Sequence, residues 1–258
     1  MPELPDVEGW RRALAEELPG QRIRRLRVTD GGILRNTTPR SAARQLVGRR
    51  FCEPRRLGKW LILPTDGPVI LVHSGMTGHP YFAASDEARE AHERLTLTLD
   101  RGEFRYADLR KLRGLWLVDH DAVSTVTGRQ GPDALTVEWE TFAEVLQGKR
   151  GKLKPALMDQ TVIAGLGNML SDEICWQARL NPMSGIADLD DAEIRRLYSK
   201  MRRVLQTAVR HGRIPRLRSW LSGVRDAPAP ACPRCGTPLR HGRSNGRTTL
   251  WCPRCQPK

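Results

Sequence analysis

Long apolar segments are missing from this sequence of 258 residues. No run approaches the roughly 18 apolar residues of a membrane-spanning helix, so a spanning segment is not expected. The N-terminus is acidic and rich in proline, which does not fit the basic stretch and hydrophobic core of a secretory signal. These two absences make the cytoplasm the expected compartment.

Acidic residues are also scarce relative to basic ones. The chain has 43 Lys and Arg against 29 Asp and Glu, which gives a formal net charge of +14 and a pI near 10.3. Such a surplus indicates a polyanionic partner, most often nucleic acid. An anionic membrane surface is the rival partner, and the lack of apolar runs argues against it. The length suits one large domain or two ordinary ones.

Cysteine is sparse except near the C-terminus, where four of the six lie in two Cys-x2-Cys pairs separated by sixteen residues: Cys232, Cys235, Cys252 and Cys255. Each pair can supply one side of a tetrahedral thiolate site, so the spacing predicts one structural zinc ion. A disulfide framework is the alternative, and it does not suit a reducing compartment. Cys52 and Cys175 stand alone and are expected to be ordinary buried thiols.

The first half of the chain reads as short β-type runs separated by turn residues. The expected strands cover residues 22–28, 50–56, 60–64, 69–73, 95–99, 103–107 and 115–119. They predict an antiparallel sandwich or flattened barrel. Apolar residues recur at helical spacing from Val7 to Leu18, which predicts a helix just after Pro5, and residues 40–46 suggest a short second one.

Residues 128–133 look like a linker, and beyond them the pattern becomes helical. Thr141 with Glu144 resembles a capping box, as does Asp190 with Glu193. An apolar stripe follows the second pair, and it predicts a long helix whose other face, rich in Lys and Arg, is either solvated or turned toward DNA. The Ala-Pro repeat of residues 227–231 reads as a stiff linker into the cysteine module.

Two segments are candidates for chemistry. Removal of Met1 would leave Pro2 with a secondary amine, which can attack an aldehyde or sugar C1′ to form an iminium, although a frayed terminus is the plainer reading. The second segment, residues 154–173, places two helical pieces around Gly165-Leu-Gly-Asn168. Exposed amides at the start of the second piece would seat a DNA phosphate, with the Asn168 side chain as a further donor, while an ordinary helix hairpin is the alternative.

Three separated motifs carry a resemblance that spans nearly the whole chain. Pro2-Glu-Leu-Pro-Asp-Val-Glu8, residues 159–173 and the closing four-cysteine finger together resemble the formamidopyrimidine-DNA glycosylase/endonuclease VIII family of bacterial enzymes. The resemblance implies an α+β protein. An N-terminal antiparallel β-sandwich with a flanking helix would occupy residues 1–128, a helical domain with a helix–two-turns–helix motif residues 134–225, and a β-hairpin zinc finger residues 226–258.

The same resemblance assigns the chemistry residue by residue. Pro2 matches the nucleophile that attacks C1′ of the damaged nucleotide, and Glu3 matches the general acid/base. Leu57-Gly-Lys-Trp60 resembles a Gly-Lys-Tyr turn, so Lys59 would contact a phosphate beside the lesion and assist elimination. The implied reaction removes an oxidised base and cuts the strand by β,δ-elimination at double-stranded DNA.

Further motifs imply contacts with DNA. His73 through Gly78 resembles His-x-Gly-Met-x-Gly, which puts His73 at a phosphate and Met76 in the gap left by the everted nucleotide. Residues 108–114 resemble Asp-Pro-Arg-Arg-Phe-Gly, so Arg110 would probe the opposite base and Leu112 would be the wedge. Asn168 and Arg247 would bind phosphates near the lesion.

The sequence departs from the family pattern in several places. Leu112 stands where the wedge is usually phenylalanine, that stretch is one residue longer, and Asp6 replaces a glutamate. The segment before Cys232 lacks the longer base-capping sequence of the 8-oxoguanine-specific branch, so an altered base pocket is expected and 8-oxoguanine activity is not.

We expect a monomer that acts on bacterial nucleoid DNA with zinc as its only metal, and no cofactor for the chemistry. One alternative is a relative that binds DNA without catalysis, or acts only at abasic sites. A second is a zinc-ribbon RNA-binding or transcription factor, which would leave the N-terminus and the segment around Asn168 unexplained.

Overall fold

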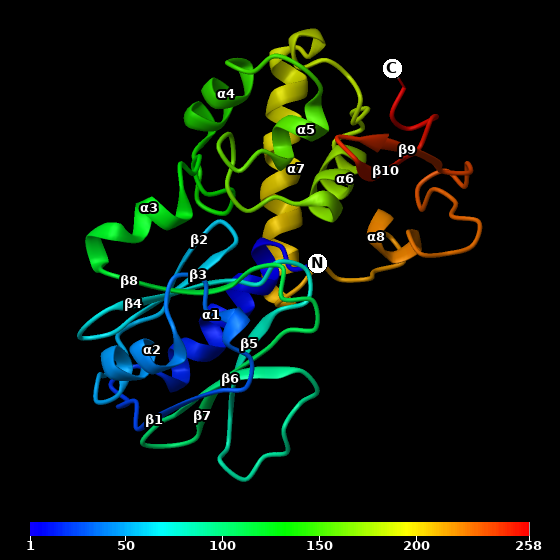
Figure 1. The fold of residues 1–258 in the computed structure, drawn as a ribbon. Coiled ribbons are helices and arrows are strands. Elements are labelled where there is room, and N and C mark those ends of the chain that lie inside the picture. Colours follow the sequence, from blue (N-terminus) through cyan, green and yellow to red (C-terminus); the bar gives the residue numbers. More distant parts are fainter. Residues whose placement is uncertain (258) are drawn as a thin grey trace. The chain divides into compact units, whose positions relative to one another are not determined.

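The structure is a computed structural model and describes residues 1–257. Contacts within the described chain divide it into two compact units. The first contains residues 1–2 and 6–128, and the second contains residues 3–5 and those from 129 onward. Figure 1 shows a first unit built mostly of strands and a second built mostly of helices, which confirms the expected α+β class. Within the described residues, no helix combines the length and apolar character that crossing a membrane requires.

Two antiparallel sheets form the first unit. One has the strand order β1-β6-β7-β5 and the other β2-β3-β4-β8. The strands are β1 (Arg25–Val28), β2 (Arg55–Leu57), β3 (Trp60–Pro64), β4 (Val69–His73), β5 (His79–Ala83), β6 (Glu93–Thr98), β7 (Glu103–Ala107) and β8 (Gly114–Val118). Residues of both sheets share one apolar core, including Leu61, Ile70, Leu97 and Phe104. A core between two sheets is the mark of a sandwich, as expected from the sequence.

Strand β3 is buried on both faces, which explains its unbroken apolar sequence. Leu61 and Leu63 point into the core between the sheets, while Trp60 and Ile62 belong to a second cluster on the other face. Helix α3 (Val123–Thr127) covers that second cluster through Val123 and Val126. Successive side chains of β3 therefore point to opposite faces of the sheet, as in any strand, but both faces are covered and both are apolar.

Three predicted strands have the bounds that the sequence indicated, and others differ. β3, β4 and β7 match, whereas residues 22–24 and 50–54 contribute isolated bridges and loop before β1 and β2 begin. Strand β5 was not predicted, because Pro80 reads as a break in a strand. β5 pairs only with β7 at the edge of its sheet, a position where a proline is tolerated.

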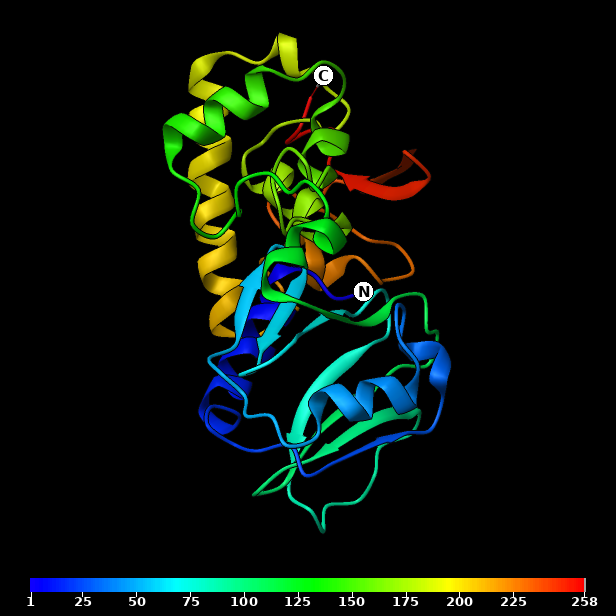
Figure 2. The same ribbon diagram turned by 60° about the vertical axis from the view of Figure 1, so that its left-hand side comes forward.

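The helices of the first unit agree with the apolar periodicity. Helix α1 (Leu4–Glu17) buries Val7 and Leu14, and helix α2 (Pro39–Leu46) starts from a Thr38 cap and buries Ala42 and Leu46. Figure 2 shows α2 lying alongside the first unit's strands, where it contacts β1. Short 3-10 turns, η1 (Gly31–Ile33) and η2 (His120–Ala122), complete this unit.

The second unit contains α4 (Trp139–Gln147), α5 (Leu153–Met158), α6 (Asn168–Gln177), the turn η3 (Ile186–Asp188), α7 (Asp191–Arg210) and α8 (Leu221–Val224). Asp190 and Glu193 form the predicted capping box at the start of α7, whose apolar stripe is buried. The other proposed box is wrong. Helix α4 begins at Trp139 after Glu138, so Thr141 lies inside the helix and does not cap it.

A hairpin of β9 (Arg240–Ser244) and β10 (Arg247–Trp251) closes the chain. Asn245 and Gly246 form its turn, both with positive φ, which is the Asn-Gly signature of a tight hairpin. Arg247, the first residue of β10, is exposed next to this turn.

Candidate active site and nucleic-acid interface

Glu3 is fully buried and is held by the backbone at the start of α6. Its Oε2 accepts hydrogen bonds from the amides of Gly167 at 2.8 Å and Leu170 at 3.2 Å, and its Oε1 accepts one from Met169 at 2.8 Å. No side chain of α6 caps its own N-terminus, so Glu3 fills that place. A carboxylate at a helix N-terminus is favoured by the aligned peptide dipoles, which stabilise its negative charge.

This arrangement corrects one expectation. The sequence predicts an exposed seat for a DNA phosphate at the start of α6, but three of the amides there already bind Glu3. Two glycines make the close approach possible. A Cβ on Gly167 would lie 2.4 Å from the Glu3 carboxyl carbon, and one on Gly165 would lie 2.4 Å from Leu4 Cδ1. The glycines therefore serve the seat of the N-terminal segment.

Leu4 fixes the same segment by packing. Its side chain is fully buried in the core of the second unit, and its amide donates to the carbonyl of Gly165 at 3.2 Å. Pro2, two residues earlier, is only partly buried and Met1 is exposed. The reactive position proposed from the sequence is thus accessible while the residues that follow it are anchored.

Lys59 lies in a tight turn between β2 and β3. Leu57 pairs with Trp60 across this hairpin, and Gly58 has the positive φ that a two-residue turn requires. Arg56 donates to the carbonyl of Gly58 at 2.9 Å and to the buried carboxylate of Glu8 at 3.1 Å. Glu8 therefore fixes the Lys59 turn through Arg56, a link that no local sequence pattern reveals.

The charge state of Glu8 fits this role. Burial by itself would raise the pKa of Glu8, but hydrogen bonds from Arg11 and Arg56 outweigh it and lower the pKa to about 2. The side chain of Arg56 is buried as well, so the pair is shielded from solvent. A paired, ionised carboxylate beside a buried guanidinium is a rigid connection.

His73 ends β4 and is neutral at physiological pH. Burial lowers its pKa to about 4, with smaller contributions from the positive charges of Arg113 and Lys59. Its Nδ1 accepts a hydrogen bond from the amide of Gly75 at 3.2 Å, so the proton of the neutral ring lies on Nε2. His73 can therefore meet a phosphate as a neutral N–H donor, while Lys59 and Arg113 supply the charge.

Met76 and Arg110 meet on two turns of the first unit. Arg110 Nη1 lies 3.0 Å from Met76 Sδ. Asp108, which is buried, accepts hydrogen bonds from Thr77 Oγ1 at 2.6 Å and from the amides of Arg110 and Lys111 at 3.1 Å. These bonds hold the turn that presents Leu112, whose side chain is 51% exposed. The turn therefore presents this apolar side chain to solvent at a fixed position.

In the second unit, Asn168 begins α6 and is half-buried, with a buried Oδ1 that has no hydrogen-bond partner among the described residues. Arg247 is exposed at the hairpin tip. The structure thus brings together Lys59 with His73, and Met76 with Arg110, within the first unit. Glu3 and Asn168 share the start of α6 in the second.

The four predicted metal ligands converge in the second unit. The Sγ atoms of Cys232, Cys235, Cys252 and Cys255 all lie within 4.8 Å of one another. Separations between three pairs of these sulfurs run from 3.4 to 3.9 Å, close to the about 3.8 Å edge of a tetrahedron with Zn–S bonds of about 2.3 Å. The cage therefore fits zinc. Of the other two thiols, Cys175 is buried as expected, but the expectation for Cys52 is wrong, because Cys52 is exposed.

A buried charge network in the second unit was not predicted from the sequence. Lys154 Nζ lies 2.7 Å from Asp172 Oδ1, and Arg225 lies 2.5 Å from Asp172 Oδ2. Lys154 also donates to the carbonyl of Thr248 at 2.9 Å. The network joins α5 and α6 to strand β10 of the hairpin. The one charged residue of the otherwise apolar α5, Lys154, is the signal that could have revealed it.

Glu173, next to Asp172, anchors a different segment. It accepts a hydrogen bond from the amide of Ser222 at 3.0 Å, and burial raises its pKa to about 7. Ser222 Oγ in turn donates to the carbonyl of Pro215 at 2.8 Å. Ser222 thereby fastens the segment before the finger to α6, and its hydroxyl ties Pro215 of the same segment to that point.

Comparison with known proteins adds three family matches along the chain. The formamidopyrimidine-DNA glycosylase N-terminal domain matches residues 1–115, the formamidopyrimidine-DNA glycosylase H2TH domain residues 130–217, and the zinc finger found in FPG and IleRS residues 231–258. The third match and the sulfur cage together assign one structural zinc ion to the four cysteines.

Individual relatives agree. The formamidopyrimidine-DNA glycosylase of Symbiobacterium thermophilum is 36% identical over all of this chain and 90% of its own, and that of Herpetosiphon aurantiacus is 34% identical over 99% of this chain and all of its own. Among solved structures, a Lactococcus lactis FPG variant with Fapy-dG-containing DNA matches with a TM-score of 0.90 at 30% identity. MutM with carbocyclic 8-oxo-G-containing DNA matches with 0.89 at 30%, and both comparisons cover each chain completely. The chain therefore belongs to the formamidopyrimidine-DNA glycosylase/endonuclease VIII family.

Proposed function

We propose that this chain is a DNA glycosylase with abasic-site lyase activity that serves base excision repair. One observation carries the proposal most strongly: a buried carboxylate, Glu3, is fixed by three backbone amides directly beside the accessible Pro2. A protein that only bound DNA would need neither residue. The relatives named formamidopyrimidine-DNA glycosylase and the structural neighbours crystallised with lesion-containing DNA support the same activity and a DNA partner.

The proposed chemistry begins with removal of Met1, which turns the nitrogen of Pro2 into a secondary amine. This amine attacks C1′ of the damaged nucleotide, and the base leaves with the electrons of the C1′–N bond and a proton. The amine loses its proton, the sugar ring opens as the C1′–O4′ bond breaks and O4′ takes up a proton, and the iminium that forms makes the C2′ proton acidic. Its loss expels the 3′ phosphate, and a second elimination expels the 5′ phosphate. Glu3 exchanges protons with the sugar during ring opening and these later steps.

The remaining site residues hold the DNA in this proposal. Lys59 and neutral His73 contact phosphates beside the lesion, while Asn168 and Arg247 grip the backbone from the second unit. Met76 fills the gap left by the everted nucleotide, Arg110 probes the opposite base and Leu112 acts as the wedge. The fixed turns that carry these side chains support the three roles. A rigid filler lowers the cost of keeping a base out of the stack.

The same scaffold favours a second candidate, action at abasic sites alone. The segment before the finger is short and fastened to α6 through Ser222. It offers no long sequence to close over a base, and Leu112 stacks on bases less well than an aromatic wedge. Oxidised bases remain the first proposal, with 8-oxoguanine the least favoured of them.

Borohydride trapping tests the nucleophile. The protein with Met1 removed is incubated with duplexes that carry an abasic site, 8-oxoguanine or 5-hydroxyuracil, and a covalent adduct is expected on at least one. The matched control has one glutamate inserted between Met1 and Pro2, which retains the methionine and leaves the Pro2 nitrogen as an unreactive amide. Equal trapping by the control would move the nucleophile elsewhere, and no adduct on any duplex would remove the enzymatic proposal.

Three further aspects belong to the same proposal. Residues 1–128 carry the nucleophile, residues 134–225 and 226–258 hold DNA from the helical region and the finger, and the protein works as a monomer on nucleoid DNA. Light scattering of the purified protein at several concentrations, with and without a lesion duplex, checks the monomer: a mass of twice 29.1 kDa in either state would contradict it.

A further inference from the structure

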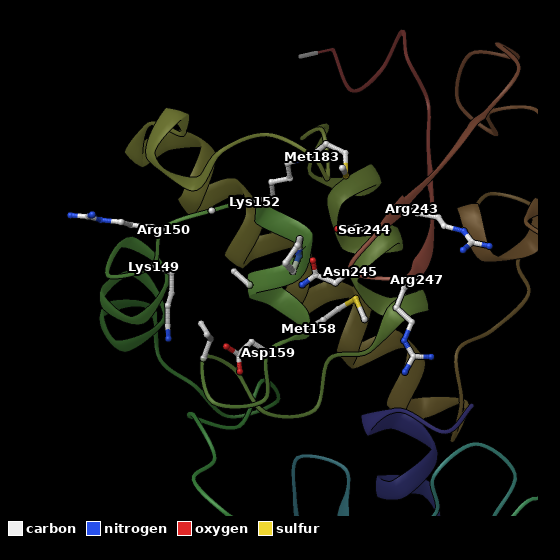
Figure 3. A pocket seen from close by; sticks show the side chains of 14 residues that line it. Lys149, Arg150, Lys152, Met158, Asp159, Met183, Arg243, Ser244, Asn245 and Arg247 are labelled. Carbon is white, nitrogen blue, oxygen red and sulfur yellow. The ribbon is translucent and has the colours of Figure 1, made fainter. Parts of the chain in front are cut away.

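A groove of about 700 Å³ lies in the second unit between α5 and the zinc-finger hairpin (Figure 3). One wall comes from the loop before α5, residues 149–152, and the opposite wall from residues 243–247 of the hairpin. Apolar side chains line it between these walls, among them Met158, Val162 and Met183. None of these residues except Arg247 has a role in the site described above.

Five cationic side chains line the groove: Lys149, Arg150, Lys152, Arg243 and Arg247. Within the part of the chain that the structure describes, none of the five side chains has an ion-pair or hydrogen-bond partner. The one carboxylate in the lining, Asp159, already accepts from the amide and hydroxyl of Thr161 at 2.9 and 2.7 Å. None of the five cations is paired with this carboxylate, so the lining carries five positive charges against one negative charge.

Two buried cations of this unit differ from those of the groove. Lys154, only two residues beyond Lys152, is buried and paired with Asp172, and Arg225 is paired with the same carboxylate. Cations that stabilise the fold are therefore given acidic partners, whereas those around the groove are not. Unpaired like charges repel one another, so gathering them on two facing walls costs stability unless an anion binds there.

The arrangement fits an extended polyanion better than a small one. A compact phosphate site needs donors that converge on one point. In Figure 3, Arg150 and Arg243 reach out on opposite sides, while Lys149 and Arg247 point along a common direction. Charges spread in this way can each meet a separate phosphate, and sugar carbons can lie on the apolar floor.

We propose that this groove binds the phosphate backbone of the undamaged duplex beyond the lesion, on one side of it only. This inference rests on the proposed function, because it takes DNA as the ligand. Arg247 stands at the edge of the groove and belongs to both the lesion contacts and this backbone track. Lys149, Arg150 and Lys152 extend the track along the opposite wall.

Salt dependence measures such contacts directly. Each phosphate neutralised on B-DNA adds about 0.9 to the slope of log K against log salt concentration, because bound counterions are released. Removing three cations that each neutralise a phosphate should therefore lower the slope by about 2 to 3 and weaken binding at low salt by about tenfold or more. The effect should appear only when the duplex is long enough to reach the groove.

The test variant carries Lys149→Gln, Arg150→Gln and Lys152→Gln together. Its matched control carries Arg25→Gln, Arg40→Gln and Arg44→Gln at exposed positions of β1 and α2 in the first unit, which removes the same charge where no DNA contact is proposed. Affinity is measured at several salt concentrations for three duplexes with an abasic-site analogue: one short on both sides, one extended only 5′ of the lesion, and one extended only 3′.

The expected result is a loss of affinity and slope for the groove variant on one extended duplex, and no difference from the unaltered protein on the short one. The control variant of the first unit should bind all three duplexes as the unaltered protein does. An equal loss on all duplexes, a matching loss in the control, or no loss at all would each overturn the groove proposal. Borohydride trapping on the short duplex tests the proposed enzymatic activity separately. The groove proposal and the activity proposal can therefore fail independently of each other.

Discussion

Glu3 and Glu8 both belong to the opening segment and are both buried, yet the two units hold them in different ways. In the second unit, Glu3 is bound by backbone amides of α6. In the first unit, Glu8 is bound by the side chains of Arg11, Arg12 and Arg56. Amides belong to every residue type except proline, so no ordinary substitution in α6 deletes the donors of Glu3. Each donor of Glu8 can be lost by one substitution.

The largest effect is expected from Glu3→Gln. The amide side chain has a similar shape, but its NH2 group would face backbone N–H donors, and it cannot take up a proton. Proton transfer by a placed carboxylate contributes about 10² to 10⁴ in rate, so single-turnover strand cleavage should fall by about that factor. Binding of an abasic-analogue duplex is the control and should change far less. If the cleavage rate of Glu3→Gln stayed within about threefold of that of the unaltered protein, the Glu3 carboxylate would have no catalytic role, because proton transfer should contribute far more than that.

Gly167→Ala tests whether the amide seat depends on backbone space. The new Cβ would lie 2.4 Å from the Glu3 carboxyl carbon, so the carboxylate must move. Such displacement should lower cleavage by about 10 to 100-fold, since misplacement by about 1 Å has costs of that order. Gly31→Ala is the matched control, because its Cβ would meet only ordinary contacts at 3.6 Å. Equal activity in both variants would contradict the steric argument.

Glu8→Gln tests the carboxylate that is held by arginine side chains instead of backbone amides. The Lys59 turn should lose its support through Arg56, which is expected to raise KM for lesion DNA several-fold with a smaller change in kcat. Because the pKa of Glu8 is lowered from 4.5 to about 2, its contribution to stability is present above pH 4.5 and is lost as the pH falls through 2.

The pH profile supplies the check. The free energy of unfolding of Glu8→Gln should lie about 1 to 3 kcal/mol below that of the unaltered protein at pH 7. The difference should shrink between pH 4.5 and about 2, the two pKa values of Glu8. The exposed Glu16 of the same helix provides the control, Glu16→Gln, with no such difference expected. A gap that stays constant across this range would mean that packing, not charge, holds the turn.

The smallest effect is expected at Leu112, an exposed apolar side chain that takes no part in the hydrogen bonds of either glutamate. Leu112→Phe adds a ring that can stack on a base, worth about 1 to 3 kcal/mol where stacking is complete. Partial stacking on a duplex should tighten binding of an abasic-analogue duplex a few-fold, and Leu112→Ala should weaken it by a similar factor. Fluorescence of 2-aminopurine opposite the lesion reports the wedge, and identical signals for all three side chains would exclude it.

Local patterns account for what the sequence predicted. The Cys-x2-Cys spacing, the Asp190 box and the strands β3, β4 and β7 each depend on neighbours in the chain, and all are confirmed. The amides that bind Glu3 lie 164 to 167 positions away, so no local pattern reveals that they are already in use. The same holds for Lys154, whose partner Asp172 lies on another helix. Long-range pairing of buried polar groups is decided by the fold as a whole.

The seat of Leu4 and Glu3 also has a consequence for the order of events during synthesis. These residues are made before their binding partners around Gly167, which follow 164 residues later. At about 5 to 20 residues per second, the delay is roughly 8 to 30 seconds. Until then the first residues cannot dock, and the bond between Met1 and Pro2 is open to a peptidase. The long separation thus gives time for the proposed removal of Met1 before the chain closes around its neighbours.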